Sequence, residues 1–183
     1  MSKRIMNEVI CTAEDETLPI FYQDTDSLHL READVPILED AFEAKYGREL
    51  RGNEMGAFHC DFEYADHTDV KSREAWFIGK KCYLDVLQGK NKDGVTEEST
   101  HIRMKGVPTQ VVKREAAQLY PGMSEIEGVC ELYSSLLRGE SIAFDLTANG
   151  TRACFDVVKN FTVKSRDSFT RRLKFPAEEI LEF

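Results

Sequence analysis

The sequence has 183 residues, of which 42% are hydrophobic, and a formal net charge of −9. This length and this apolar share predict a packed core of one ordinary domain, or of a compact domain with a small appendage, and exclude global disorder. No apolar run approaches the roughly 18 residues of a membrane span, and Met1 does not open a secretory signal, so we expect a soluble intracellular protein.

The first elements predicted are a helix and a β-hairpin. Residues 3–15 carry an apolar stripe at helical spacing, which predicts an amphipathic helix. Two short apolar runs, residues 20–23 and 28–30, flank the polar sequence Asp-Thr-Asp-Ser and predict two strands joined by a tight turn. In the second run the two leucines point to one face and His29 points to the other.

A second helix and several strands follow. Asp34 is a suitable N-cap for a helix that begins at Val35, and Gly47 is a suitable C-terminal stop. Residues 88–100, rich in Gly, Lys, Asp and Glu, predict a long, exposed and mobile loop. Strands are predicted on both sides of it, at residues 58–62, 74–83, 83–87 and 101–104.

The C-terminal part begins with a third helix, predicted over residues 109–119. Tyr-Pro-Gly at residues 120–122 favours a domain junction. Ser124 and Glu127 have the spacing of a capping box and open a fourth helix, which Gly139 closes. Further strands are predicted at residues 143–146 and 153–158, around a turn at residues 147–150. The sequence therefore predicts an α+β fold with domains at residues 1–119 and 120–183.

Charge is distributed unevenly along the chain. Residues 1–79 carry 8 Lys/Arg against 18 Asp/Glu, whereas residues 151–174 carry 7 Lys/Arg against two Asp. This asymmetry fits an acidic metal-holding part joined to a basic phosphate-facing part, and it equally fits the solvated faces of an acidic protein.

The five cysteines are scattered singly, which argues against a disulfide framework or a zinc site and predicts small buried side chains. The four histidines match no zinc motif, so they are expected to be structural or surface residues.

Two carboxylates, Asp24 and Asp26, lie at the predicted hairpin turn. Hard cations such as Mg²⁺ take oxygen ligands and share them between carboxylates and substrate phosphates. The spacing alone also occurs in structural Asx turns, in calcium loops and in transferases of nucleotide sugars. An EF-hand is disfavoured because its glycine and its twelfth-position glutamate are missing.

The hexapeptide from Tyr22 to Ser27, Tyr-Gln-Asp-Thr-Asp-Ser, resembles motif C of family B DNA polymerases. The resemblance implies nucleotidyl transfer by two Mg²⁺ ions, with Asp26 as the firmer metal ligand and Asp24 as the second. It also places Tyr22, Thr25 and Ser27 near the primer terminus and the incoming nucleotide.

Two later segments resemble further parts of the same family, in the same order. Lys80, Lys81 and Tyr83 match its Lys-x-Tyr motif, which contacts the primer and template. Lys105 and Gly106 resemble the segment that closes the palm beside the primer strand. The resemblance implies an antiparallel polymerase palm at residues 1–119, and a small thumb at residues 120–183 whose basic end would grip duplex phosphates through Arg166, Arg171, Arg172 and Lys174. That basic end is equally compatible with a solubilising strand.

Residues 46–50, residues 56–63 and the basic end at residues 165–175 resemble the protein-primed branch of the family, found in linear plasmids, phages and viral elements. The partners implied are primer-template DNA, nucleoside triphosphates and a terminal protein, with no membrane. The location implied is the cytoplasm, or the organelle or virus factory of a plasmid or viral host.

Motifs A and B of the family, and its exonuclease carboxylates, do not occur in these 183 residues. We therefore expect no primer extension by this chain alone, and expect it to act with an upstream polymerase part. One alternative is a non-catalytic DNA-binding or assembly module that keeps the palm turn as a scaffold. A weaker one is a transferase of nucleotide sugars, against which the Lys-x-Tyr segment counts.

Overall fold

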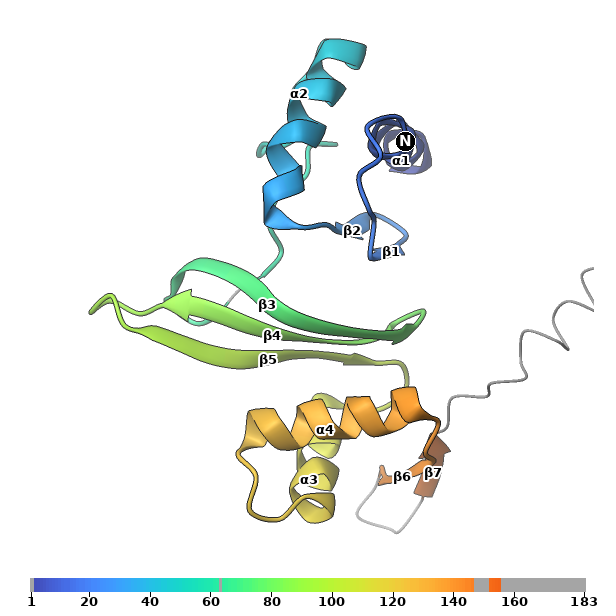
Figure 1. Ribbon diagram of the computed structural model, residues 1–183, viewed down its shortest axis with the longest axis vertical. Coiled ribbons are helices and arrows are strands. Elements are labelled where there is room, and N and C mark those ends of the chain that lie inside the picture. The colour runs from blue at the N-terminus through green and yellow to red at the C-terminus, as the bar shows by residue number, and fades with distance from the viewer. Residues whose placement is uncertain (1, 63, 147–151, 156–183) are drawn as a thin grey trace, which may run out of the picture. The chain divides into compact units, whose positions relative to one another are not determined.

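The computed structural model describes residues 2–62, 64–146 and 152–155 (Figure 1). The chain divides into two compact units, Met1–Gly106 and Val107–Phe183. The sequence places a junction near residue 120, whereas the structural division falls earlier, so that the third helix groups with the fourth. The basic residues Arg166, Arg171, Arg172 and Lys174, and the predicted turn at 147–150, lie outside the described residues.

The architecture is α+β with antiparallel sheets, as the sequence predicts. The first unit contains α1 (Ser2–Asp15), β1 (Tyr22–Asp24), β2 (Ser27–His29), the short 3-10 helix η1 (Glu32–Asp34), α2 (Val35–Tyr46), β3 (Thr68–Gly79), β4 (Cys82–Lys90) and β5 (Thr96–Met104). The second contains α3 (Thr109–Leu119), α4 (Glu125–Arg138), β6 (Ile142–Asp145) and β7 (Arg152–Phe155). No helix among the described residues is long and apolar enough to cross a membrane.

One apolar cluster joins α1, α2 and the predicted hairpin. Val9 and Ala13 of α1 meet Leu38 and Phe42 of α2, and all four are buried. The partly buried residues packed against this cluster are Ile5, Leu18, Ile20, Leu28, Leu30, Tyr46 and Phe58. The two leucines around His29 thus lie on the core side of β2, as the alternation predicts. Gly47 ends α2 in the left-handed region, at φ 65°, where glycine is favoured.

The strands β3, β4 and β5 form a three-stranded antiparallel sheet with β4 in the middle (Figure 1). The prediction of a long mobile loop at residues 88–100 is wrong, because β4 runs on to Lys90 and β5 begins at Thr96. Asn91 explains the short connection. Its side-chain oxygen accepts hydrogen bonds from the backbone N–H groups of Asp93 and Val95, both at 3.0 Å, and this fixes a tight turn within the polar run.

The strand predicted at residues 58–62 does not form, although apolar residues at 58, 60 and 62 alternate with polar ones. Phe58 makes one isolated bridge, with Arg51, and packs on the α1–α2 cluster. Phe62 instead contacts the ring of His29, with ring centroids 5.8 Å apart. Phe58 and Phe62 therefore pack against different parts of the first unit, and the segment between them does not pair as a strand.

The second unit is built on α3 and α4. Its capping box is present as predicted: the Ser124 hydroxyl accepts from the N–H of Glu127, and the Glu127 carboxylate accepts from the N–H of Ser124. The apolar stripe of α4 supplies the fully buried residues Val129, Leu132, Tyr133 and Leu136. Beside these helices, β6 and β7 pair antiparallel.

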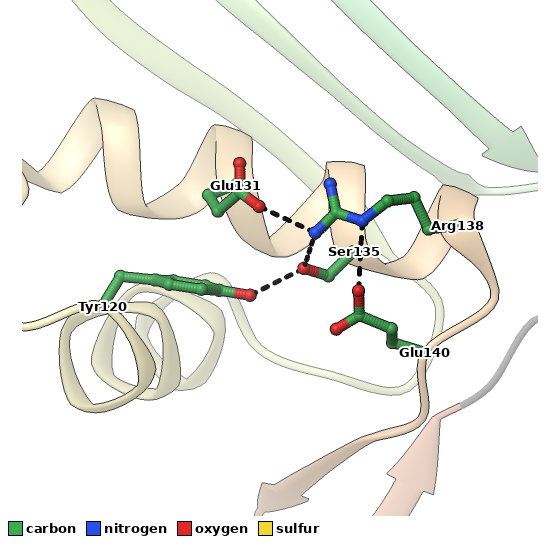
Figure 2. A network of polar contacts seen from close by, with 5 residues as sticks. All are labelled: Tyr120, Glu131, Ser135, Arg138 and Glu140. Atoms are coloured by element: carbon green, nitrogen blue, oxygen red, sulfur yellow. Dashed lines mark hydrogen bonds and ion pairs between the residues drawn. The ribbon is translucent and has the colours of Figure 1, made fainter.

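A polar network closes the end of α4 (Figure 2). The buried Ser135 hydroxyl lies 2.8 Å from the Tyr120 hydroxyl, and it accepts a hydrogen bond from Arg138 at 2.7 Å. Arg138 also pairs with Glu131 at 2.7 Å and with Glu140 at 3.0 Å. This network links the C-terminal end of α3 to the last turn of α4.

We predict that Ser135→Ala lowers the free energy of unfolding of the second unit by about 1–3 kcal/mol, because it takes a hydrogen-bond partner from Tyr120 and from Arg138. Urea denaturation measures the change. The exposed Ser141→Ala is the control and should change stability by less than about 0.5 kcal/mol. Equal stability of the Ser135 variant and the wild type would contradict the assignment.

Candidate functional site

Alternation along the β1–β2 hairpin decides on which face Asp24 lies. Tyr22 pairs with His29 and Asp24 pairs with Ser27, so these four residues share one face of the hairpin. Leu28 faces the opposite way, into the α1–α2 cluster. The predicted strand-turn-strand is therefore confirmed, and the carboxylate of Asp24 lies on the same face as the two rings.

The tip of the hairpin is ordered around Asp24. The Thr25 hydroxyl donates to the Asp24 carboxylate at 3.2 Å, and the Ser27 hydroxyl donates to the Asp24 carbonyl at 3.3 Å. Thr25 has φ 21°, which is unusual for a β-branched residue. Asp26 follows on the tip and is exposed. The turn thus holds one carboxylate in place and presents the other to solvent.

Lys81 connects three separated segments through its backbone. Its N–H donates to the Tyr22 hydroxyl at 2.8 Å, and its carbonyl accepts from the N–H of Lys105 at 2.9 Å. Lys81 is the second residue of the two-residue turn between β3 and β4, and it has φ 57°, a left-handed conformation that ordinarily favours glycine. The hairpin, the Lys-x-Tyr segment and the Lys105–Gly106 turn therefore meet at one residue.

The side chain of Lys81 extends this connection to the carboxylate. Its Nζ lies 3.4 Å from Oδ2 of Asp24. Burial raises the pKa of Asp24, but the hydrogen bond from Thr25 and the ammonium groups of Lys81 and Lys80 outweigh burial, so the pKa lies below its ordinary value. Asp24 is consequently ionised near neutral pH.

Positive charge lines the end of the sheet at which the β3–β4 turn lies, here called the basic edge. Lys80, Lys81 and Lys105 are all exposed, and they lie on turns that a backbone hydrogen bond joins. Arg103 of β5 is exposed too and stands opposite Tyr83 in the register. Arg103 was not among the residues singled out from the sequence. In the sequence, the one indication of a role for Arg103 is its place two residues before Lys105.

Aromatic rings fill the space behind this edge. Tyr22 stacks on Phe77, with centroids 5.3 Å apart and ring planes within 6°, and it contacts Tyr83 at 4.8 Å. Burial raises the pKa of Tyr83. Burial, together with the charge of Arg103, lowers the pKa of His101, whose ring stacks on Tyr83. Tyr22 and Tyr83, from two different motifs, thus form one aromatic group.

One buried carboxylate in this region was missed by sequence reasoning. Asp85 of β4 is fully buried, and its Oδ2 lies 3.3 Å from Nε2 of His29. His29 was expected to be an ordinary structural or surface residue, and its side chain is 15% exposed. Asp85 sits two residues after Tyr83 in an otherwise apolar run, and that isolated acid was the available signal.

The donor set at the hairpin suits a hard divalent cation, since Asp24 and Asp26 offer carboxylate oxygens. Within residues 2–62, 64–146 and 152–155, no group of three or more His, Cys, Asp or Glu side chains is arranged to hold a metal ion. The hairpin offers the oxygens of two carboxylates.

A cavity of about 490 Å³ lies in the second unit, beside α3 and β6. Its charged lining residues are engaged with one another. Arg114 pairs with Glu115 at 3.2 Å and also donates to the carbonyl of Asp145. This cavity adds nothing to the carboxylate hairpin.

No protein-family model matches this chain, and a search of the curated proteins finds no match either. The likeness to a polymerase therefore depends on the three sequence motifs and on the geometry that joins them.

The cysteines differ from the expectation of uniform burial. Cys82 is buried in the sheet, but Cys11 and Cys60 are exposed and Cys130 is half-buried. Burial raises the pKa of Cys82 to about 11. Because the thiolate is the reactive form, Cys82 is protected both by its packing and by its protonation.

We predict that iodoacetamide at pH 8 labels Cys11 and Cys60 readily and leaves Cys82 unlabelled in the folded protein. Mass mapping of the labelled peptides measures the pattern. Denaturation in urea should make Cys82 react like the other two. Rapid labelling of native Cys82 would contradict the described packing of the β3–β4 turn.

Proposed function

We propose that this chain supplies part of the active site of a family B DNA polymerase, in which template-directed nucleotidyl transfer uses two Mg²⁺ ions. The first unit would provide the C-terminal part of the palm, and the second unit would begin the thumb. Asp24 and Asp26 are the metal ligands in this proposal. Nucleoside triphosphates and primer-template DNA are the substrates.

The convergence at Lys81 carries the proposal. Three segments that resemble successive polymerase motifs lie far apart in the sequence, and Lys81 bonds to the first through Tyr22 and to the third through Lys105. Its ammonium group also lies 3.4 Å from Asp24. A structural Asx turn would not require a basic turn from a distant hairpin beside its carboxylate.

The residues of this chain have separable tasks in the proposed reaction. Bound Mg²⁺ would neutralise phosphate charge and activate the primer hydroxyl. Asp24 and Asp26 would hold the ions, while the hydroxyls of Thr25 and Ser27 donate hydrogen bonds to Asp24 within the turn. Lys81, after the hydrogen bond from Thr25, helps to lower the pKa of Asp24, and in this proposal it would stand beside the path of a phosphate backbone.

The basic edge is the proposed DNA contact. Lys80, Lys81 and Lys105 are exposed cations that can neutralise phosphates, and such contacts give affinity that is independent of sequence. Tyr83 lies behind them with its ring against Tyr22. This arrangement offers a ring and several cations to one duplex end.

The remaining part of the active site would come from a polypeptide that carries motifs A and B, because these do not occur in the 183 residues. A two-ion site that lacks one of its carboxylates should not hold both ions well. The protein-primed branch adds a terminal protein as a further proposed partner.

We predict that the chain alone does not extend a primer in Mg²⁺, and that a fragment carrying motifs A and B restores synthesis. Asp26→Asn should reduce the restored rate by at least about 100-fold, since a catalytic metal contributes several kcal/mol of transition-state stabilisation. Single-turnover primer extension measures the rate.

The exposed Asp40→Asn on α2 is the control for a lost surface carboxylate, and it should match the wild type. Robust synthesis by the chain alone would contradict the need for a second part. Unchanged DNA affinity together with activity that is insensitive to Asp26→Asn would favour the non-catalytic DNA-binding module instead.

A further inference from the structure

The buried pair of His29 and Asp85 connects the carboxylate hairpin to the central strand of the sheet. His29 ends β2 and stands opposite Tyr22 in the hairpin register. Asp85 lies in the middle of β4, paired with Ala75 on one side and with His101 on the other. The contact between Nε2 of His29 and Oδ2 of Asp85, at 3.3 Å, therefore runs from the hairpin to the most enclosed strand of the sheet.

The Asp85 carboxylate is fixed at both oxygens. Oδ1 accepts a hydrogen bond from the Ser72 hydroxyl of β3 at 2.8 Å, while Oδ2 faces His29. Asp85 is fully buried, and burying a carboxylate is costly unless it is paired and hydrogen-bonded. Undocking of the hairpin would remove one of these partners. The loss of that partner would leave a buried polar oxygen without its contact, and this cost favours the docked hairpin.

The ring of His29 is also enclosed by aromatic side chains. Its centroid lies 5.1 Å from that of Phe77, 5.3 Å from Tyr83 and 5.4 Å from Tyr22, all with edge-to-face geometry. Among the described residues, no group forms a hydrogen bond with its buried Nδ1. Asp85 is therefore the polar partner that sets the orientation of the imidazole, while the rings set its position.

The hairpin needs such an attachment. β1 and β2 are three residues each, and an isolated two-stranded hairpin is at best marginally stable in water. Apolar contacts hold its Leu28 face, but they are non-directional. The His29–Asp85 contact is directional, and it lies on the face that carries Asp24.

We propose that His29 and Asp85 are positioning residues, which fix the β1–β2 hairpin on the sheet so that Asp24 and Asp26 keep a geometry suited to a divalent cation. What Asp24 and Asp26 do rests on the proposed function. The attachment of the hairpin does not, and it can be tested separately.

Amide hydrogen exchange tests the attachment directly in the full chain. The Lys81 N–H donates to the Tyr22 hydroxyl and therefore reports on docking of the hairpin on the sheet. The Phe21 N–H donates to the His29 carbonyl within the hairpin, so it reports on the pairing that docking stabilises. We expect Asp85→Asn to speed exchange at both amides by about tenfold or more. His29→Phe keeps a ring and removes Nε2, and it should have the same effect.

The Mn²⁺ affinity of the chain tests the consequence for the carboxylates. Residues that orient metal ligands typically change affinity by 10–100-fold when replaced, so both variants should bind Mn²⁺ about tenfold more weakly or worse. Glu97→Gln is the matched control, because it removes a second histidine–carboxylate contact of the first unit, with His67 at 3.0 Å. This control should leave both measurements at the wild-type level.

Unchanged protection of the Lys81 and Phe21 amides in both variants would overturn the proposal. Uniformly faster exchange across the first unit, or faster local exchange with unaltered Mn²⁺ affinity, would overturn the positioning role. Should one variant not fold, the other, together with the milder Ser72→Ala, decides. If the Asp26→Asn variant binds Mn²⁺ as tightly as the wild type, the proposed function fails. Hydrogen exchange alone then decides whether the attachment of the hairpin exists.

Discussion

The two faces of the β1–β2 hairpin govern the organisation of the first unit. Side chains alternate along β1 and β2, so Leu28 enters the apolar cluster of α1 and α2 while Tyr22 and His29 meet the rings and the buried acid of the sheet. A slip of one residue in register would bury the polar face and expose the apolar one. The position of Asp24 is consequently fixed by packing on both sides of the hairpin.

This constraint explains how a basic turn comes to lie beside an acidic one. The ring of Tyr22 is stacked on Phe77 while its hydroxyl accepts from the backbone N–H of Lys81, and the ammonium group of Lys81 lies beside Asp24. A carboxylate and ammonium groups lie together at this edge, beside aromatic rings. The carboxylate can bind a divalent cation, and the ammonium groups can bind a phosphate. The proposed polymerase role is one use of that arrangement.

Much of the fold follows from local rules that act within a few residues. The period of the apolar stripes predicts α1 and α2, Ser124 and Glu127 predict the start of α4, and Gly47 predicts the end of α2. The predicted secondary structure was wrong where the contacts of a single side chain outweighed the preference of the segment around it. Asn91 accepts backbone hydrogen bonds that make a tight turn of a polar stretch. Phe58 packs on α1 and α2, and its segment forms no strand although its pattern is typical of one.

The candidate site could be predicted only in part, for a physical reason. Asp24 and Asp26 are recognisable because their spacing is local, and Lys81 is recognisable by its motif. The contact between His29 and Asp85 spans residues far apart in the sequence, and nothing in the spacing predicts it. Such pairings depend on how two elements dock, and docking is decided by the summed burial of both faces of the hairpin.

Paramagnetic broadening by Mn²⁺ in the ¹⁵N-labelled chain tests the central claim most directly, namely that the hairpin carboxylates bind a divalent cation beside the basic turn. The account predicts that substoichiometric Mn²⁺ first broadens the amide signals of residues 24–27 and next those of Lys80 and Lys81. Mg²⁺, which prefers the same oxygen ligands, should reverse the broadening. Broadening that begins elsewhere, such as at His67 and Glu97, or that spreads evenly over the acidic surface, would contradict it.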